Sequence, residues 1–218
     1  MSEIILVLGT SGSGKSYSLR NLDPKTSLLA SVDGKRPPFS LKDWPRLDSK
    51  NPSGSFYVPQ RADPYGTLKR AILSGVKAGK KTIVIDDSQF LLANDFFAKA
   101  HEKGYEKFTV MGQQFWTLIE FCRDLPEDVT VYFMHHQELD TFGNIQVKTI
   151  GKMLSEKGSI EGRFTICLVA QKVDGHYGFY SNLTDQTIAK APPNMFGSDP
   201  MDNDLKAIDD SIREYWSL

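Results

Sequence analysis

Short apolar runs alternate along the chain with stretches of helical periodicity. The apolar runs that predict buried strands cover residues 4–8, 26–32, 82–85 and 129–134. Apolar residues recur at helical spacing over residues 65–78 and again over residues 90–122, with a break near Gly104. The aromatic residues of the second region, among them Phe90, are interpreted as core positions. This alternation predicts an α/β fold with a mostly parallel sheet flanked by helices on both faces.

The carboxyl-terminal half adds antiparallel structure to this pattern. Residues 164–173 and 177–183 predict a hairpin at one edge of the sheet. Residues 138–149 predict a loop or a small hairpin, and residues 150–157 predict a short helix. Leu205, Ile208 and Ile212 are spaced for an amphipathic helix at the end of the chain, over residues 203–217.

Residues 35–64 interrupt the alternation. Proline recurs there at positions that prevent long regular elements: Pro37, Pro38, Pro45, Pro52, Pro59 and Pro64. Aromatic residues between the prolines supply apolar anchors, so the segment is expected to be an ordered insertion that packs on the core. With this insertion, residues 1–218 are expected to form one domain.

A glycine-rich motif follows the first predicted strand. Residues 9–16 read Gly-Thr-Ser-Gly-Ser-Gly-Lys-Ser and match the phosphate-binding loop G-x-x-x-x-G-K-[ST]. A helix predicted over residues 15–21 completes the strand–loop–helix context, and a flexible turn is the competing interpretation. In such a loop backbone N–H groups and the lysine bind phosphates, while the serine hydroxyl binds Mg²⁺. The expected ATP-binding residues are Gly9, Thr10, Ser11, Gly12, Ser13, Gly14, Lys15, Ser16 and Tyr17, with Ser16 also a Mg²⁺ ligand.

Polar residues end two other predicted strands. Asp86 and Asp87 follow the run 82–85, where a carboxylate can emerge beside the phosphates. Asp86 is the expected Mg²⁺ partner, and Asp87 is a candidate base or water-orienting residue. An Asp pair that caps the following helix is the alternative. Asp33, after the run 26–32, competes for the role of base.

The strand predicted over residues 129–134 closes on His135, His136 and Gln137. A polar residue at this position can contact the nucleotide or its attacking water. Because side chains alternate along a strand, one histidine is expected to face the phosphates and the other to point away. The sequence leaves open which one does so.

Composition adds limits rather than a function. The chain has 218 residues, 40% of them hydrophobic, and a formal net charge of −1, so any nucleic-acid surface has to be local. The two cysteines, Cys122 and Cys167, lie among apolar neighbours without metal-type spacing. With no targeting segment and no run of membrane-spanning length, a soluble cytoplasmic protein with buried thiols is expected.

Three functional classes fit a phosphate loop. The guanine-reading Asn-Lys-x-Asp of a GTPase does not occur in the sequence. A kinase that phosphorylates a nucleoside or another small molecule needs an arginine-rich lid, and Arg36 and Arg61 in the insertion keep this class open. An ATPase fits the Asp-Asp and His-His-Gln strand ends. A nucleotide-gated binding module with little hydrolysis is a third, non-enzymatic alternative.

Several short strings occur together in one order: the loop at 9–16, Val-Asp-Gly-Lys at 32–35 with Pro-Pro-Phe at 37–39, Ile-Asp-Asp at 85–87, Phe-Met-His-His at 133–136, and Thr-Ile-Gly-Lys-Met-Leu at 149–154. Over about residues 3–197 the chain resembles the small AAA-type ATP-binding proteins of tailed bacteriophages. That group is similar to the RecA recombinase core, and some members are associated with single-strand annealing. The resemblance implies a RecA-like P-loop ATPase that handles single-stranded DNA in phage recombination or replication, in the host cytoplasm.

The same resemblance assigns roles to individual positions. It implies that His136 takes the place of the polar residue after the fourth core strand, and that residues 137–149 correspond to the mobile DNA-binding loop. It also implies assembly into a homo-oligomer, with a single-strand binding protein as a candidate partner. Two departures are visible: this loop carries Lys148 as its one cation, and Asp33 stands where RecA-like proteins usually carry a catalytic Glu.

The local evidence for DNA binding is a group of cations within this loop and just after it. The candidate DNA-binding residues are Lys148, Lys152 and Lys157, with Arg163 nearby and Phe142 as a stacking residue. An ordinary solvated face is the alternative. Lys152 or Arg163 is also a candidate to reach the γ-phosphate bound by a neighbouring subunit.

Overall fold

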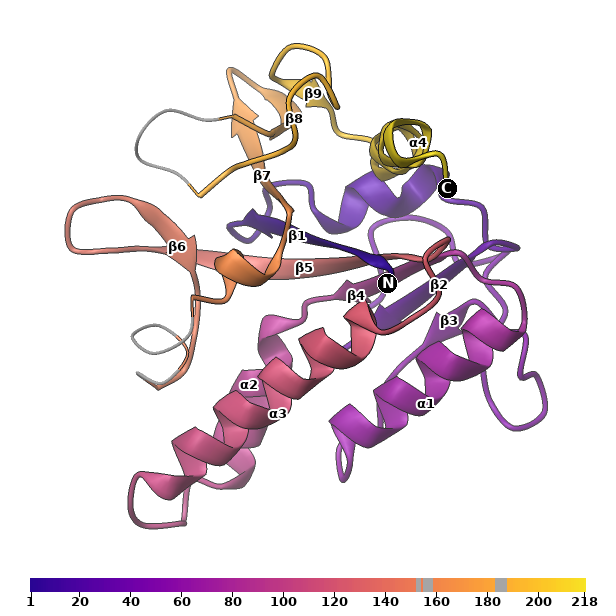
Figure 1. Ribbon diagram of the computed structural model, residues 1–218. Coiled ribbons are helices and arrows are strands. Elements are labelled where there is room, and N and C mark those ends of the chain that lie inside the picture. Colours follow the sequence, from indigo (N-terminus) through magenta and orange to yellow (C-terminus); the bar gives the residue numbers. More distant parts are fainter. Residues whose placement is uncertain (152–153, 155–158, 183–187) are drawn as a thin grey trace.

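One mixed sheet organises the molecule (Figure 1). The structure, a computed structural model, describes residues 1–151, Leu154, 159–182 and 188–218. Within these residues the strand order is β3, β2, β4, β5, β1, β7, β8 and β9, with β6 paired to β5. The strands are β1 (Glu3–Gly9), β2 (Ser27–Ser31), β3 (Phe56–Tyr57), β4 (Thr82–Asp86), β5 (Thr130–Leu139), β6 (Ile145–Val147), β7 (Ile166–Val173), β8 (His176–Tyr180) and β9 (Met201–Asp202).

The centre of the sheet is parallel and its carboxyl-terminal edge is antiparallel. β1 pairs in parallel with β5 and β7, and β4 pairs in parallel with β2 and β5. β5 therefore lies between β1 and β4, and the register sets Gly9 opposite His136. β7, β8 and β9 are antiparallel neighbours, which confirms the predicted edge hairpin. The predicted α/β architecture with a mostly parallel sheet is confirmed.

Helices cover both faces of this sheet (Figure 1). The helices α1 (Pro64–Lys77), α2 (Gln89–Ala98) and α3 (Glu106–Arg123) bury Leu68, Leu91 and Phe115 in a core with the side chains on one face of the strands. The 3₁₀ helix η1 (Ser16–Asn21) and α4 (Leu205–Trp216) bury Leu19 and Ile208 on the other face. None of the helices in the described part of the chain is long and apolar enough to cross a membrane.

A buried carboxylate attaches α4 to the strands beneath it. Asp209 is 3% exposed and accepts hydrogen bonds from Thr82 Oγ1 at 2.9 Å, Thr130 Oγ1 at 2.6 Å and Tyr132 Oη at 2.8 Å. Arg213, one helical turn further, donates its Nε to Asp209 at 2.8 Å. Each oxygen of the carboxylate is therefore paired, as a charge at this depth requires.

The insertion at 35–64 packs on the core, as expected. Trp44 and Leu47 are 6% exposed, and the segment contributes the short strand β3, which the sequence did not predict. β3 adds to the open side of β2 through Leu29 and Ala30. A strand of two residues is too short to show the alternation that predicts strands, and the prolines around it indicate a loop.

Several predicted boundaries need correction. The helix after the glycine loop is a 3₁₀ helix of six residues, and the predicted carboxyl-terminal helix at 203–217 begins at Leu205. β5 continues to Leu139, beyond its predicted end at residue 134, and its pairing with β6 confirms the hairpin among the two alternatives for 138–149. The short helix predicted over 150–157 lies largely outside the described residues, which omit 152–153 and 155–158.

Candidate functional site

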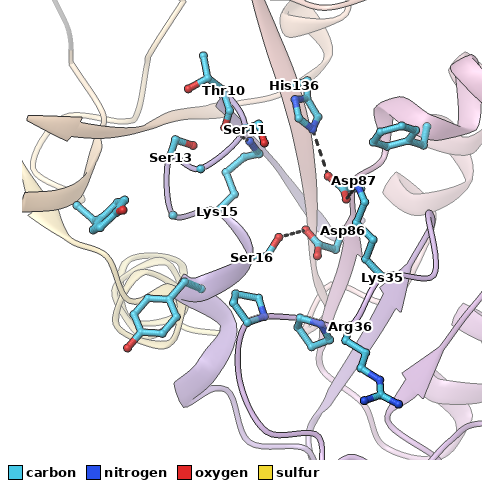
Figure 2. Close-up of a pocket in the computed structure, with 17 residues that line it drawn as sticks. Thr10, Ser11, Ser13, Lys15, Ser16, Lys35, Arg36, Asp86, Asp87 and His136 are labelled. Carbon is cyan, nitrogen blue, oxygen red and sulfur yellow. Dashed lines mark hydrogen bonds and ion pairs between the residues drawn. The ribbon is translucent and has the colours of Figure 1, made fainter.

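The glycine loop lines a cavity of about 750 Å³ at the carboxyl ends of the parallel strands (Figure 2). Gly12 and Gly14 have φ angles of 78° and 97°, in the left-handed region that favours glycine. Gly9 is packed closely, because a Cβ atom there would come within 2.8 Å of the carbonyl oxygen of Ala170. Of the nine predicted nucleotide-binding residues, those from Thr10 to Tyr17 line the cavity, and Gly9 lies outside the lining.

Lys15 is folded back over its own loop (Figure 2). Its Nζ donates to the carbonyl oxygens of Gly9 at 2.6 Å and Thr10 at 2.9 Å, and the residue is 6% exposed. Burial lowers the pKa of Lys15 to about 8, against the opposing charges of Asp87 and Asp86. Among the described residues Lys15 has two carbonyl partners and no carboxylate bound to it, and an incoming anion stabilises such a buried cation further.

Ser16 and Asp86 face each other across the cavity floor (Figure 2). The hydroxyl of Ser16 donates to Asp86 Oδ1 at 3.1 Å. Burial, and then the charge of Asp87, raises the pKa of Asp86 to about 6. No group of three or more His, Cys, Asp and Glu side chains in the described residues can hold a metal. One hydroxyl and one carboxylate nevertheless suit Mg²⁺, which keeps several waters and takes few protein ligands.

Asp87 has a different environment from its neighbour. Its φ of 59° is left-handed, a conformation that aspartate tolerates better than most residues. His136 Nε2 donates to Asp87 Oδ1 at 3.2 Å, and the Nζ of Lys35 lies 3.6 Å from Oδ2. The hydrogen bond from His136 lowers the pKa of Asp87, assisted by the charges of Lys35 and Lys15. The carboxylate thus lines the cavity in its ionised form.

The two histidines have separate environments. His135 is fully buried, where its Nε2 donates to the carbonyl of Lys148 at 2.8 Å and its Nδ1 lies 2.9 Å from Ser88 Oγ. Burial lowers the pKa of His135 to about 4, so its ring is neutral. His136 lines the cavity. Both residues lie within β5 and not beyond its end, which corrects the prediction that the strand closes before them.

The second candidate base lies beside the cavity rather than in its lining. Asp33 follows β2 and pairs with Lys35, whose Nζ is 2.9 Å from Asp33 Oδ2. Lys35 therefore connects Asp33 to Asp87, while of these two carboxylates Asp87 lines the cavity.

The predicted DNA-binding cations do not gather in one described patch. Lys148 is exposed, and Lys152 and Lys157 lie outside the described residues. Arg163 is held against α3, with its guanidinium 4.7 Å from the ring centre of Trp116 and 3.5 Å from a carboxylate oxygen of Glu120. This contact explains the position of Arg163 without a nucleotide.

The hairpin of β5 and β6 carries Phe142 at its tip, with 85% of the residue exposed. Two carboxylates, Glu138 and Asp140, share the hairpin and its turn, while Lys148 follows β6. The ring is therefore accessible for stacking, but the charge around it does not favour phosphate.

Sequence reasoning missed part of the cavity wall. Lys35, Pro37, Pro38 and Phe90 line it, together with Tyr177 from β8. Phe90 packs against the core, as expected, and its exposed part adds to the cavity wall, where the ring meets His136 edge-on at 6.0 Å. The place of Lys35 just beyond the end of β2 was a usable signal. Tyr177 had none, because only the edge hairpin brings it to the loop.

Comparison of the sequence with protein-family models finds no matching family, and comparison with curated proteins finds no match.

Proposed function

We propose that the protein binds ATP together with Mg²⁺ and hydrolyses it. The observation that carries this proposal is the meeting of three groups in one cavity: the glycine loop with Lys15, the pair of Ser16 and Asp86, and the pair of Asp87 and His136. Each group supplies a different requirement of phosphoryl transfer.

Phosphate binding falls to the loop and its lysine. Glycines with positive φ allow successive N–H groups to converge on an anion, and Lys15 adds a cation from within the cavity. Because η1 has six residues and 3₁₀ geometry, its dipole adds less than an α-helix would. The loop amides and Lys15 therefore account for most of the binding.

Mg²⁺ would be held by the Ser16 hydroxyl and the Asp86 carboxylate, directly or through water. When bound, it supplies positive charge to the phosphate oxygens. The Ser16–Asp86 hydrogen bond keeps both oxygens at the cavity floor before any cation arrives.

Asp87 is the proposed base and His136 its positioning residue. In hydrolysis, the oxygen of water bonds to the γ-phosphorus, the bond from that phosphorus to the β–γ bridging oxygen breaks, and ADP leaves with the electron pair. The proton of the water passes to Asp87 and then to solvent. His136 fixes the carboxylate for this step through its 3.2 Å hydrogen bond.

The kinase alternative receives less support. Arg36 lines the nucleotide cavity, but Arg61 lines a separate cavity of about 530 Å³ between α1, α2 and α3. The two arginines that kept a lid plausible therefore do not converge. The position of β5 between β1 and β4 agrees better with the RecA-like core, because it brings His136 from that strand into the lining of the cavity.

Single-stranded DNA is the proposed effector, on the strength of the resemblance and of one structural connection. The hairpin that exposes Phe142 is a continuation of the strand that carries His136. The N–H of Lys148, just after the hairpin, donates to the carbonyl of His136 at 3.0 Å. A ligand stacked on the hairpin would thereby act on the residue that positions Asp87.

Phosphate release from ATP by the wild type, Lys15→Ala and Asp87→Asn, with and without single-stranded DNA, tests these proposals. We expect turnover in the wild type, a loss of at least about 100-fold in either variant and stimulation by DNA. Lys42→Ala, an exposed change in the insertion outside the cavity lining, is the control. If Asp87→Asn turns over ATP as fast as the wild type, Asp87 is not the base. Turnover only with a nucleoside acceptor would favour the kinase.

A further inference from the structure

Lys35 occupies an unusual place in the nucleotide cavity (Figure 2). Its Nζ lies 2.9 Å from Asp33 Oδ2, 3.6 Å from Asp87 Oδ2 and 4.7 Å from the ring centre of Phe90. One ammonium thus lies between both carboxylates that compete for the role of base. These contacts of the ammonium involve neither the glycine loop nor the pair of Ser16 and Asp86.

The backbone of Lys35 is held by a hydrogen bond, whereas its side chain lies at the surface. The carbonyl of Lys35 accepts a hydrogen bond from Ser31 Oγ at 3.1 Å, and Gly34, with a φ of 72°, turns the chain back toward β2. The side chain, by contrast, is 62% exposed. Ion pairs at such exposure contribute little stability, so the ammonium can exchange these partners at small cost.

The charges around the cavity make such an exchange favourable. A terminal phosphate beside Ser16 would approach the carboxylates Asp86 and Asp87, which repel it. Lys15 already donates to two carbonyls of its own loop. Of the described cations that line the cavity, Lys35 is the one paired with Asp87, and its long stem allows the ammonium to turn from the carboxylates to a phosphate oxygen.

We propose that Lys35 binds the terminal phosphate and so distinguishes a nucleoside triphosphate from a diphosphate, an inference that rests on the proposed function. With a diphosphate, Lys35 stays with Asp33 and Asp87. With a triphosphate, it leaves both carboxylates, and Asp87 is no longer bound to a cation. A purely structural role for the same lysine would tie the end of β2 to β4 and would be indifferent to the nucleotide.

Competition against a fluorescent nucleotide measures the affinities of ATP and ADP, both with Mg²⁺, for the wild type, Lys35→Ala and Lys35→Arg. A charge-assisted contact to the terminal phosphate is worth about tenfold in affinity. We expect Lys35→Ala to lower the affinity for ATP by about that factor and to change the affinity for ADP by less than about twofold. Lys35→Arg is expected to restore most of the preference for ATP over ADP. Lys42→Ala, with its lysine exposed outside the cavity, is expected to change neither affinity.

Two results would overturn the inference, and they differ from each other. Equal changes in the affinities for ATP and ADP in Lys35→Ala, or no change in either affinity, would mean that the lysine has only a structural role. The proposed nucleotide binding would be unaffected by that result. A wild type that binds neither nucleotide would remove the proposed function and this inference with it. Thermal unfolding of each variant verifies that the affinities refer to folded protein.

Discussion

Asp86 and Asp87 are neighbours in the chain, yet their environments shift their pKa values in opposite directions. Burial raises the pKa of Asp86 to about 6, with a further contribution from the charge of Asp87. The hydrogen bond from His136 lowers the pKa of Asp87. The left-handed backbone at Asp87 separates the two carboxylates, so that one meets Ser16 and the other meets His136. The proposed Mg²⁺ ligand and the proposed base are thus consecutive residues.

The raised pKa of Asp86 predicts a stability gain when its charge is removed. The folded state holds a proton on Asp86 up to a pH of about 6, whereas the unfolded chain releases it near 3.8. The free energy of unfolding therefore loses up to about 3 kcal/mol as the pH rises through this window. We expect Asp86→Asn to be more stable than the wild type at pH 7.5, and this advantage to shrink toward pH 4.

Urea unfolding in a chelating buffer without nucleotide measures this difference. Asp43→Asn, at an exposed position of the insertion, controls for the loss of one negative charge. An Asp86→Asn protein that is less stable than the wild type at pH 7.5 would show that the Ser16 contact outweighs the desolvation of the carboxylate.

At the scale of elements, α4 is held to the sheet by a polar contact as well as an apolar one. Ile208 and Ile212 pack on the face of the sheet that also buries Leu19 of η1. Beside them, Asp209 bridges β4 and β5 through Thr82 and Thr130. The sequence showed that this helix is amphipathic. It did not show that the Asp209 carboxylate points toward the sheet, because an aspartate at this position fits equally well on the solvent-exposed face.

Removing the Asp209 carboxylate is expected to be far more damaging than removing its neighbour. Asp209→Ala leaves Arg213 and three hydroxyl groups without their shared partner, which predicts a loss of about 3–5 kcal/mol in the free energy of unfolding. Asp210→Ala removes an exposed pair with Lys206 and is expected to cost about 0.5 kcal/mol or less. Urea unfolding compares the two variants, and similar small losses would contradict the role given to Asp209.

At the scale of the whole molecule, both cysteines are buried in the core between the sheet and α1, α2 and α3. Burial raises the pKa of Cys167 to about 12 and that of Cys122 further. A thiol reagent is therefore expected to modify the native protein only as fast as it unfolds, and both thiols at once in denaturant. Rapid reaction of one thiol in the native protein would mean that its part of the core opens separately.

The sequence predicted those features that depend on short patterns. The apolar runs located the parallel strands, and the glycine motif and Asp86 lie together because parallel strands end at one edge. The sequence did not show whether His135 or His136 faces the cavity. Alternation along a strand places neighbouring side chains on opposite faces but does not say which face is which. Sequence reasoning missed Lys35 and Tyr177 as parts of the cavity wall, because their approach to the loop depends on how the insertion and the edge hairpin fold over the sheet.

Calorimetric titration of ATP into the wild type and Lys15→Met tests whether the glycine loop and Asp86 bind ATP with Mg²⁺. We expect the wild type to bind ATP more tightly with Mg²⁺ than without it. In Lys15→Met the affinity is expected to fall by at least about tenfold while the fold is retained. Equal affinity in the two proteins, or no binding by the folded wild type, would show that the loop and Asp86 do not form an ATP site.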